Sequence, residues 1–131
     1  KIQGGDTSVI DDYSKLDLAP CKLEVKATKS GYIKTFKNKK LGFLCTDLGG
    51  GRKTKSDSID FGVGFIVHKK LSDKVKLNET VVTIYHRKTQ QKLAEKIAQE
   101  INEQVIKITK TKPAKAPVIY DVLKSKKDKS K

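Results

Sequence analysis

The sequence has no methionine and no tryptophan, and aromatic residues make up only 6% of it. It also has no apolar run near the about 20 residues that a membrane-spanning helix needs, and no charged start followed by an apolar stretch marks a secretory signal. For 131 residues we therefore expect one modest core and a cytoplasmic chain without a membrane partner. Because natural chains begin with methionine and this one begins with Lys1, we expect either a piece of a longer polypeptide or a processed product.

Cysteine and histidine are also scarce. Cys21 and Cys45 are the two cysteines, and their spacing fits no zinc or redox motif, so we expect both to be reduced. His68 and His86 lie on separate predicted strands, and we expect both at strand-end surface positions. No Ser-His-Asp or Cys-His arrangement is evident. We therefore predict no catalytic residue, no cofactor and no metal site in this chain.

Acidic residues are in the minority, and the net charge of +14 is typical of proteins that bind nucleic acid or another polyanion. Arginine, however, is almost absent: Arg52 and Arg87 are the only two among 29 basic residues, whereas phosphate clamps and base readers favour its planar fork. Nine lysines lie in residues 107–131, and we expect 124–131 to be a disordered basic tail. We favour a solvated lysine-rich surface without specific nucleic acid binding. A charge-driven nucleic-acid-binding module is the alternative.

Apolar alternation predicts strands near the start of the chain. Lys22–Thr28 places Leu23, Val25 and Ala27 on one face. Tyr32–Lys37 is predicted to be a second strand, and the Ser30-Gly31 turn before it indicates a hairpin-like unit. Later strands are predicted in the apolar runs at 61–67, 80–86, 105–109 and 118–123. In the first of these runs, Gly62 and Gly64 share a face on which another backbone can approach closely.

Helical spacing predicts two helices. After Asn38 the apolar row is Leu41, Leu44, Cys45 and Leu48; after Thr89 it is Leu93, Ile97, Ile101 and Val105. The element order is then roughly β-β-α-β-β-α-β, which is not the regular alternation of a doubly wound sheet and indicates an α+β domain. We expect residues 1–18 to be a connector and residues 19–123 to form the domain.

The glycine triplet after the first predicted helix is the one candidate site. Gly49, Gly50 and Gly51 precede Arg52 and Lys53, so exposed backbone N–H groups and cations lie together. Anion sites, however, usually lie at the start of a helix, and the spacing fits neither the P-loop nor the dinucleotide fingerprint. We favour a helix C-cap and a mobile loop. An accessory anion contact or an interdomain contact at these five residues is the other interpretation.

Several short blocks together resemble a known enzyme family. They are Gln3–Asp12, Ser30–Ile33, Leu41-Gly42, Gly49–Arg52, Asp57, Ile59-Asp60, Val63-Gly64, Lys74–Leu77 and Ile84-Tyr85. In these blocks the chain resembles the C-terminal part of pyrimidine-nucleoside phosphorylases, which include thymidine phosphorylase. The resemblance runs from about Gln3 to Leu123, and the Gly-Gly-Gly-Arg block followed by Asp, Ile-Asp and Val-Gly is its most specific part.

The resemblance implies an enzyme in which inorganic phosphate cleaves a pyrimidine nucleoside to the free base and a pentose 1-phosphate. Such enzymes are usually homodimers, with an α domain hinged against a larger α/β portion. The C-terminal part is similar to an α/β-hammerhead, related to barrel-sandwich hybrids. The family's phosphate and pyrimidine segments lie upstream and do not occur here. The resemblance thus implies an inactive accessory domain that completes the N-terminal catalytic portion and places the Gly49–Lys55 loop near the cleft.

The segment from Lys74 to Ile84 is also similar to the second half of biotinyl or lipoyl carrier domains. No lysine is framed here as their modified lysine is, so we interpret the likeness as shared architecture. Asn78 stands where the family's turn commonly has glycine, and we expect it to adopt the left-handed conformation that asparagine tolerates.

Overall fold

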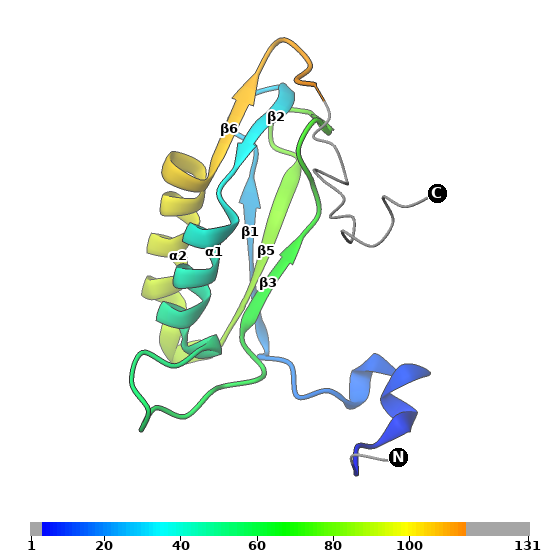
Figure 1. Cartoon of the computed structure of the whole chain (residues 1–131), viewed down its shortest axis with the longest axis vertical. Helices are drawn as coiled ribbons and strands as arrows, with labels where there is room; N and C mark the ends of the chain where they lie inside the picture. The colour runs from blue at the N-terminus through cyan, green and yellow to red at the C-terminus, as the bar shows by residue number, and fades with distance from the viewer. Residues whose placement is uncertain (1–3, 115–131) are drawn as a thin grey trace, which may run out of the picture.

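The computed structural model describes residues 4–114, which fold into two three-stranded antiparallel sheets and two helices (Figure 1). The first sheet has the order β1-β5-β3, with bounds Cys21–Lys26, Thr80–His86 and Gly64–Val67. The second has the order β4-β2-β6, with bounds Lys74–Val75, Gly31–Phe36 and Ile106–Thr109. The helices are α1 (Asn38–Cys45) and α2 (Gln91–Glu100). This confirms the predicted α+β class.

The core lies between the first sheet and the helices. In the β1–β5 pair, Leu23 faces Ile84 and Val25 faces Val82, so the apolar positions of the two strands share one face. Helix α2 packs against β1 and β5 and buries Ala94 and Ile97. The predicted row continues through Ile101 and Val105, both fully buried in the π-type turn Ile101–Val105 that follows the helix. The strand and helix periodicities are therefore confirmed on this face.

The predicted hairpin of the first two strands is wrong. Strand β1 pairs with β5, and β2 pairs with β4 and β6 in the other sheet. Between them the chain crosses from one sheet to the other. Ala27 donates its N–H to the carbonyl of Glu79 at 2.9 Å, and Asn78 donates to the carbonyl of Ala27 at the same distance. The crossing is thus held by a turn far away in sequence, where Asn78 has the predicted positive φ of 64°.

The strand predicted over 61–67 begins only at Gly64. Residues Asp60–Gly62 form a turn instead: the N–H of Gly62 donates to Oδ1 of Asp60 at 2.9 Å, and Phe61 points into solvent. The predicted close approach is present at Gly62, where a Cβ would lie 2.5 Å from the carbonyl oxygen of Asp17. At Gly64 the prediction is wrong, because no atom lies within 4 Å of a Cβ there.

Of the two histidines, His68 is exposed after β3, where Nε2 lies 2.8 Å from Oγ1 of Thr83. His86 is buried at the end of β5, so its predicted surface position is wrong. It alternates with Val82 and Ile84 and therefore points to the same core face. The predicted strand at 118–123 and the predicted tail at 124–131 lie outside the described residues.

Residues 4–18 precede the first sheet as two 3-10 turns, Thr7–Ile10 and Tyr13–Lys15. Asp6 caps the first turn by accepting the N–H of Ser8 at 2.9 Å, and Asp12 caps the second by accepting that of Ser14 at 2.9 Å. No residue of either turn is buried. In Figure 1 this segment, in dark blue, lies to one side of the sheets and helices.

Candidate interdomain site at the glycine loop and Arg87

The predicted site begins where α1 ends. A π-type turn, Thr46–Gly50, follows the helix, and Gly49 adopts a φ of 104°, the left-handed conformation expected of a glycine C-cap. The carbonyl of Gly49 accepts the N–H of Asp60 at 3.0 Å. The segment Gly49–Asp60, here called the glycine loop, is therefore closed at its base by a backbone hydrogen bond.

The remaining glycines pack against the end of the helix. A Cβ on Gly50 would lie 2.7 Å from Sγ of Cys45, and one on Gly51 would lie 2.6 Å from Oγ1 of Thr46. Burial raises the pKa of the Cys45 thiol, which keeps this sulfur protonated beside the loop. The side of these two glycines on which a Cβ would project is thus occupied by the chain's own atoms.

The tip of the glycine loop is organised by Asp57. Its carboxylate accepts the backbone N–H groups of Lys53 and Thr54 at 2.9 and 3.0 Å and the Thr54 hydroxyl at 2.6 Å. The Thr54 hydroxyl is the main cause that lowers the pKa of Asp57, and the backbone donors add to it. The ammonium group of Lys53 pairs with Asp47 at 2.6 Å, while Arg52 is exposed. A carboxylate of the chain therefore holds two of the loop's backbone donors.

Arg87, directly after β5, forms a polar cluster beside the glycine loop that sequence reasoning did not identify. Its Nε and Nη2 donate to the two carboxylate oxygens of Asp60 at 2.8 and 2.7 Å, which is a bidentate pair. Nη2 also donates to Oδ2 of Asp17 at 3.0 Å. The guanidinium lowers the pKa of Asp60 to about 2, and Asp60 in turn raises the pKa of Arg87.

Gln90 extends this cluster to the helix end. Its Oε1 accepts the backbone N–H of Arg87 at 2.8 Å, and its Nε2 donates to the carbonyl of Leu48 at 2.8 Å. The four residues Asp17, Asp60, Arg87 and Gln90, here called the Arg87 junction, join the connector, the glycine loop, the end of β5 and the π-type turn that follows α1. One sequence signal pointed to it: Arg87 is one of two arginines in a lysine-rich chain, and lysine cannot form the bidentate pair.

The contacts of the Arg87 junction hold segments of the chain in place and do not form a site for acid–base catalysis. Asp60, with its pKa of about 2, stays ionised at neutral pH, so it cannot serve as a general acid there. Within residues 4–114, no group of three or more His, Cys, Asp or Glu side chains is placed to hold a metal ion. None of the helices in that part of the chain has the length and apolarity to cross a membrane.

Comparison with known proteins gives a consistent assignment. The family described as the pyrimidine nucleoside phosphorylase C-terminal domain matches residues 32–105. The chain is 41% identical over 120 residues to a pyrimidine-nucleoside phosphorylase of Geobacillus stearothermophilus, which covers 91% of this chain and 27% of that protein. It is 44% identical over 85 residues to one of Staphylococcus aureus strain USA300, covering 65% of this chain and 20% of that protein. The chain thus spans about a quarter of the length of these curated relatives.

Proposed function

Because the chain belongs to the family of pyrimidine nucleoside phosphorylase C-terminal domains, we propose that it is the accessory C-terminal domain of a pyrimidine-nucleoside phosphorylase. In the whole enzyme, inorganic phosphate attacks the anomeric carbon of a pyrimidine nucleoside and yields a free base and a pentose 1-phosphate. The observation that carries the proposal is the family match over residues 32–105, which runs from β2 through α2.

The catalytic groups of the proposed enzyme belong to the portion that precedes this domain. The state of the acidic side chains in the site supports this division. Asp57 holds the loop tip through the N–H groups of Lys53 and Thr54, and Asp60 is neutralised by Arg87. Neither carboxylate is poised to exchange protons near neutral pH, because the pKa values of both are lowered. The domain then contributes structure rather than acid–base chemistry.

Residues 1–18 serve as the connector from the catalytic portion, residues 19–123 as the domain and residues 124–131 as a basic tail. The Arg87 junction supports the role of the connector, since Asp17 is bound to the same guanidinium that holds the glycine loop. Gly49, Gly50, Gly51, Arg52 and Lys53 form the interdomain contact that faces the cleft. The exposure of Arg52 at the base of the loop is the observation that favours this placement.

The family assignment also supports the remaining properties of the proposed enzyme. Its partners are the N-terminal catalytic portion of the same polypeptide, inorganic phosphate and a pyrimidine nucleoside. It works as a homodimer in the cytoplasm, without a cofactor and without specific binding of nucleic acid. The chemistry of the proposed reaction needs no redox or metal group in this domain, because phosphate itself is the nucleophile.

A chimera tests the proposal. In it, this chain replaces the matching segment of the Geobacillus stearothermophilus relative, and phosphorolysis of thymidine and uridine is measured by release of the free base. We expect the chimera to be active and the isolated chain to release no base above a protein-free blank. The unaltered relative is the control. Phosphorolysis by the isolated chain would contradict the proposal, and so would a chimera that unfolds cooperatively yet has no activity.

A further inference from the structure

The sheet β1-β5-β3 has two unlike faces. Helix α2 packs on the face that carries Val82 and Ile84. The opposite face carries Tyr85, with Lys22 beside it on β1 and Gly64 beside it on β3, as the strand register requires. Ile66, next to Thr83, lies on that face as well. Figure 1 shows both helices on one side of this sheet.

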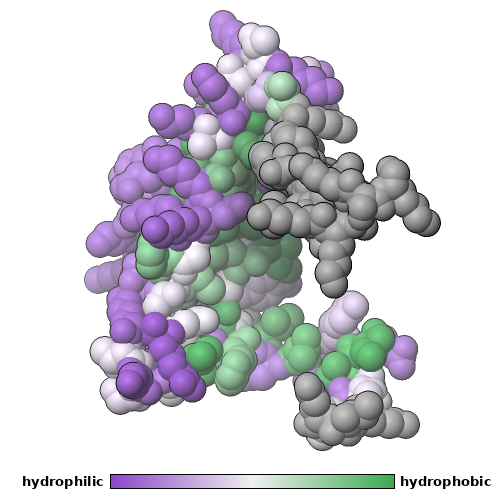
Figure 2. Space-filling model, viewed as in Figure 1, coloured by the Kyte–Doolittle hydropathy of each residue, from purple (hydrophilic) through white to green (hydrophobic). Residues whose placement is uncertain are grey.

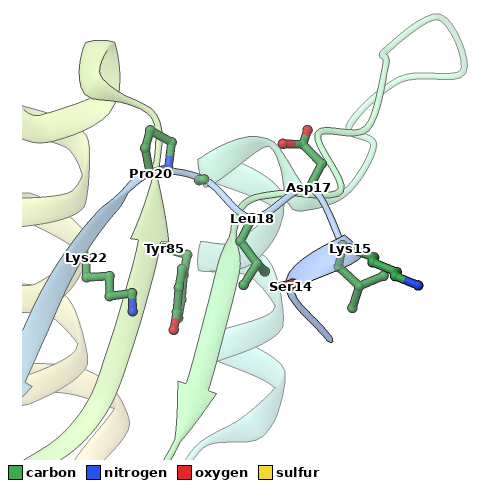
Figure 3. Close-up of a pocket in the computed structure, with 9 residues that line it drawn as sticks. Ser14, Lys15, Asp17, Leu18, Pro20, Lys22 and Tyr85 are labelled. Carbon is green, nitrogen blue, oxygen red and sulfur yellow. The ribbon is translucent and has the colours of Figure 1, made fainter. Parts of the chain in front are cut away.

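Five apolar or aromatic residues gather on the open side of the sheet, here called the open patch: Leu16, Leu18, Phe61, Ile66 and Tyr85. Phe61 is 87% exposed, Leu18 is 51% exposed and Ile66 is 47% exposed. Two adjoining hollows of about 580 and 150 Å³ share Leu18 and Tyr85 as lining residues. Figure 3 shows the ring of Tyr85 between Lys22 and Leu18. The patch is therefore continuous from the sheet to the connector.

The Arg87 junction fixes the two most exposed members of the open patch. Phe61 stands between Asp60, which is held by Arg87, and Gly62, whose carbonyl accepts the N–H of Ala19 at 2.8 Å. Leu18 stands between Asp17, which is held by the same guanidinium, and Ala19. Both apolar side chains are thus presented by backbone that is already anchored on either side. Such preorganisation lowers the entropy that binding costs.

Charged side chains cover the helical side, and Lys15, Asp17 and Lys22 also line the larger hollow on the open side. Figure 2 shows hydrophilic side chains along the outer side of the helices and at the lower left, and hydrophobic ones in the middle of the view and along its lower part, toward the connector. Lysines such as Lys39, Lys40 and Lys96 belong to the helical side. A concave area with exposed apolar and aromatic side chains and a few charged ones among them is typical of a protein-binding surface.

We propose that the open patch is the surface on which the catalytic portion of the same polypeptide docks, through an apolar surface of its own. This inference rests on the proposed function. The curated relatives are about four to five times as long as the segment they share with this chain, since that segment is 27% of one and 20% of the other, and the family's description places it at their C-terminal end. The connector that leads from the preceding portion itself forms one wall of the larger hollow. Its tethered partner therefore has a high effective concentration at this place.

A binding experiment tests the docking surface. The part of the Geobacillus stearothermophilus relative that precedes the matched segment is expressed separately and titrated with this chain by calorimetry. We expect Phe61→Ser to weaken binding by about tenfold or more, as loss of an aromatic anchor does. The matched control is Phe43→Ser on α1, because Phe43 is 58% exposed but lies on the helical side. Its effect should stay within about twofold.

Equal effects of the two serine variants would overturn the docking surface, and so would failure of the unaltered chain to bind. A Phe61-dependent dimer of this chain alone in sedimentation would assign the patch to a second copy and overturn the proposal. A truncated chain ending at Ala114 that binds the preceding portion about tenfold more tightly than the full chain would assign the patch to residues 115–131 and would also overturn the proposal.

The chimera separates this inference from the proposed function and does not require the preceding portion to fold alone. Phe61→Ser and Phe43→Ser are introduced into it, and thermal unfolding and phosphorolysis are measured. Selective destabilisation by Phe61→Ser in an inactive chimera supports the docking surface and overturns the proposed function. An active chimera that both variants leave equally stable overturns the docking surface and leaves the proposed function standing.

Discussion

The two faces of the sheet β1-β5-β3 are built by different forces. On the helix-covered face, Val25, Val82 and Ile84 are buried beside α2, and this burial follows from local apolar periodicity. On the open face, Phe61 and Leu18 stay exposed because polar contacts hold the backbone around them. Hydrophobic burial therefore stabilises one face, while the other face uses hydrogen bonds to keep hydrophobic groups available.

The largest expected difference between the two faces is tested by alanine substitution of two isoleucines on neighbouring strands, one on each face. Ile84 is 0% exposed on the helix-covered face, whereas Ile66 is half-exposed on the open face. We expect Ile84→Ala to lower the free energy of unfolding by about 2–5 kcal/mol, because it leaves a cavity in the core. Ile66→Ala should cost less than about 1 kcal/mol. Urea unfolding of both variants measures the difference, and similar losses would mean that the open face is not open in solution.

The second prediction concerns the two arginines. Arg87→Lys removes the bidentate pair with Asp60 and the contact with Asp17, and we expect a loss of about 1.5–3 kcal/mol in the free energy of unfolding. Arg52→Lys is the control, since Arg52 is exposed, and its effect should lie within about 0.5 kcal/mol. Urea unfolding at low salt measures both. If the Arg87→Lys variant is as stable as the Arg52→Lys control, the Arg87 junction does not contribute to the stability of the fold.

Sequence reasoning succeeded on the helix-covered face, where local periodicity decides the structure, and failed where residues far apart in the sequence meet. Sequence reasoning predicted the strand Thr80–His86 and the helical row that ends in Ile101 and Val105. Each of these patterns lies within a short continuous segment of the sequence. The sheet partner of β1 was not predictable. This strand pairs with β5, and the alternation of apolar residues within one strand does not indicate which strand lies beside it. Arg87 reaches Asp60 over 27 positions and Asp17 over 70, so no local pattern could reveal the junction.

The third prediction compares alanine substitutions at Gly62 and Gly64, two glycines at the edge of the open face. A Cβ at Gly62 would meet both the carbonyl oxygen of Asp17 and Nη2 of Arg87 at 2.5 Å, whereas at Gly64 it meets nothing within 4 Å. We expect Gly62→Ala to cost about 1–2 kcal/mol, because the connector and the guanidinium must both move. Gly64→Ala should change stability by less than about 1 kcal/mol. Thermal unfolding of both variants measures this, and equal midpoints would contradict the close packing of the connector.

The smallest expected effect is the pH dependence that Asp60 gives to the junction. Its pKa in the folded chain is about 2, lowered from 3.8 by the hydrogen bonds from Arg87. The folded state therefore binds a proton less readily than the unfolded state, so this contribution to stability is complete above about pH 4 and is lost as the pH falls toward about 2. The core contacts of Ile84 carry no such dependence, because they involve no titrating group.

Asp60→Asn isolates this contribution from that of the other carboxylates. The variant should be less stable than the unaltered chain at pH 7, since the amide cannot replace the charged bidentate acceptor. The gap between the two proteins should narrow as the pH falls from about 4 to about 2, where Asp60 takes up its proton. Urea unfolding at several pH values measures the gap. A gap that stays constant across this range would mean that Asp60 is not held by Arg87 in solution, and the anchored presentation of Phe61 would then lose its support.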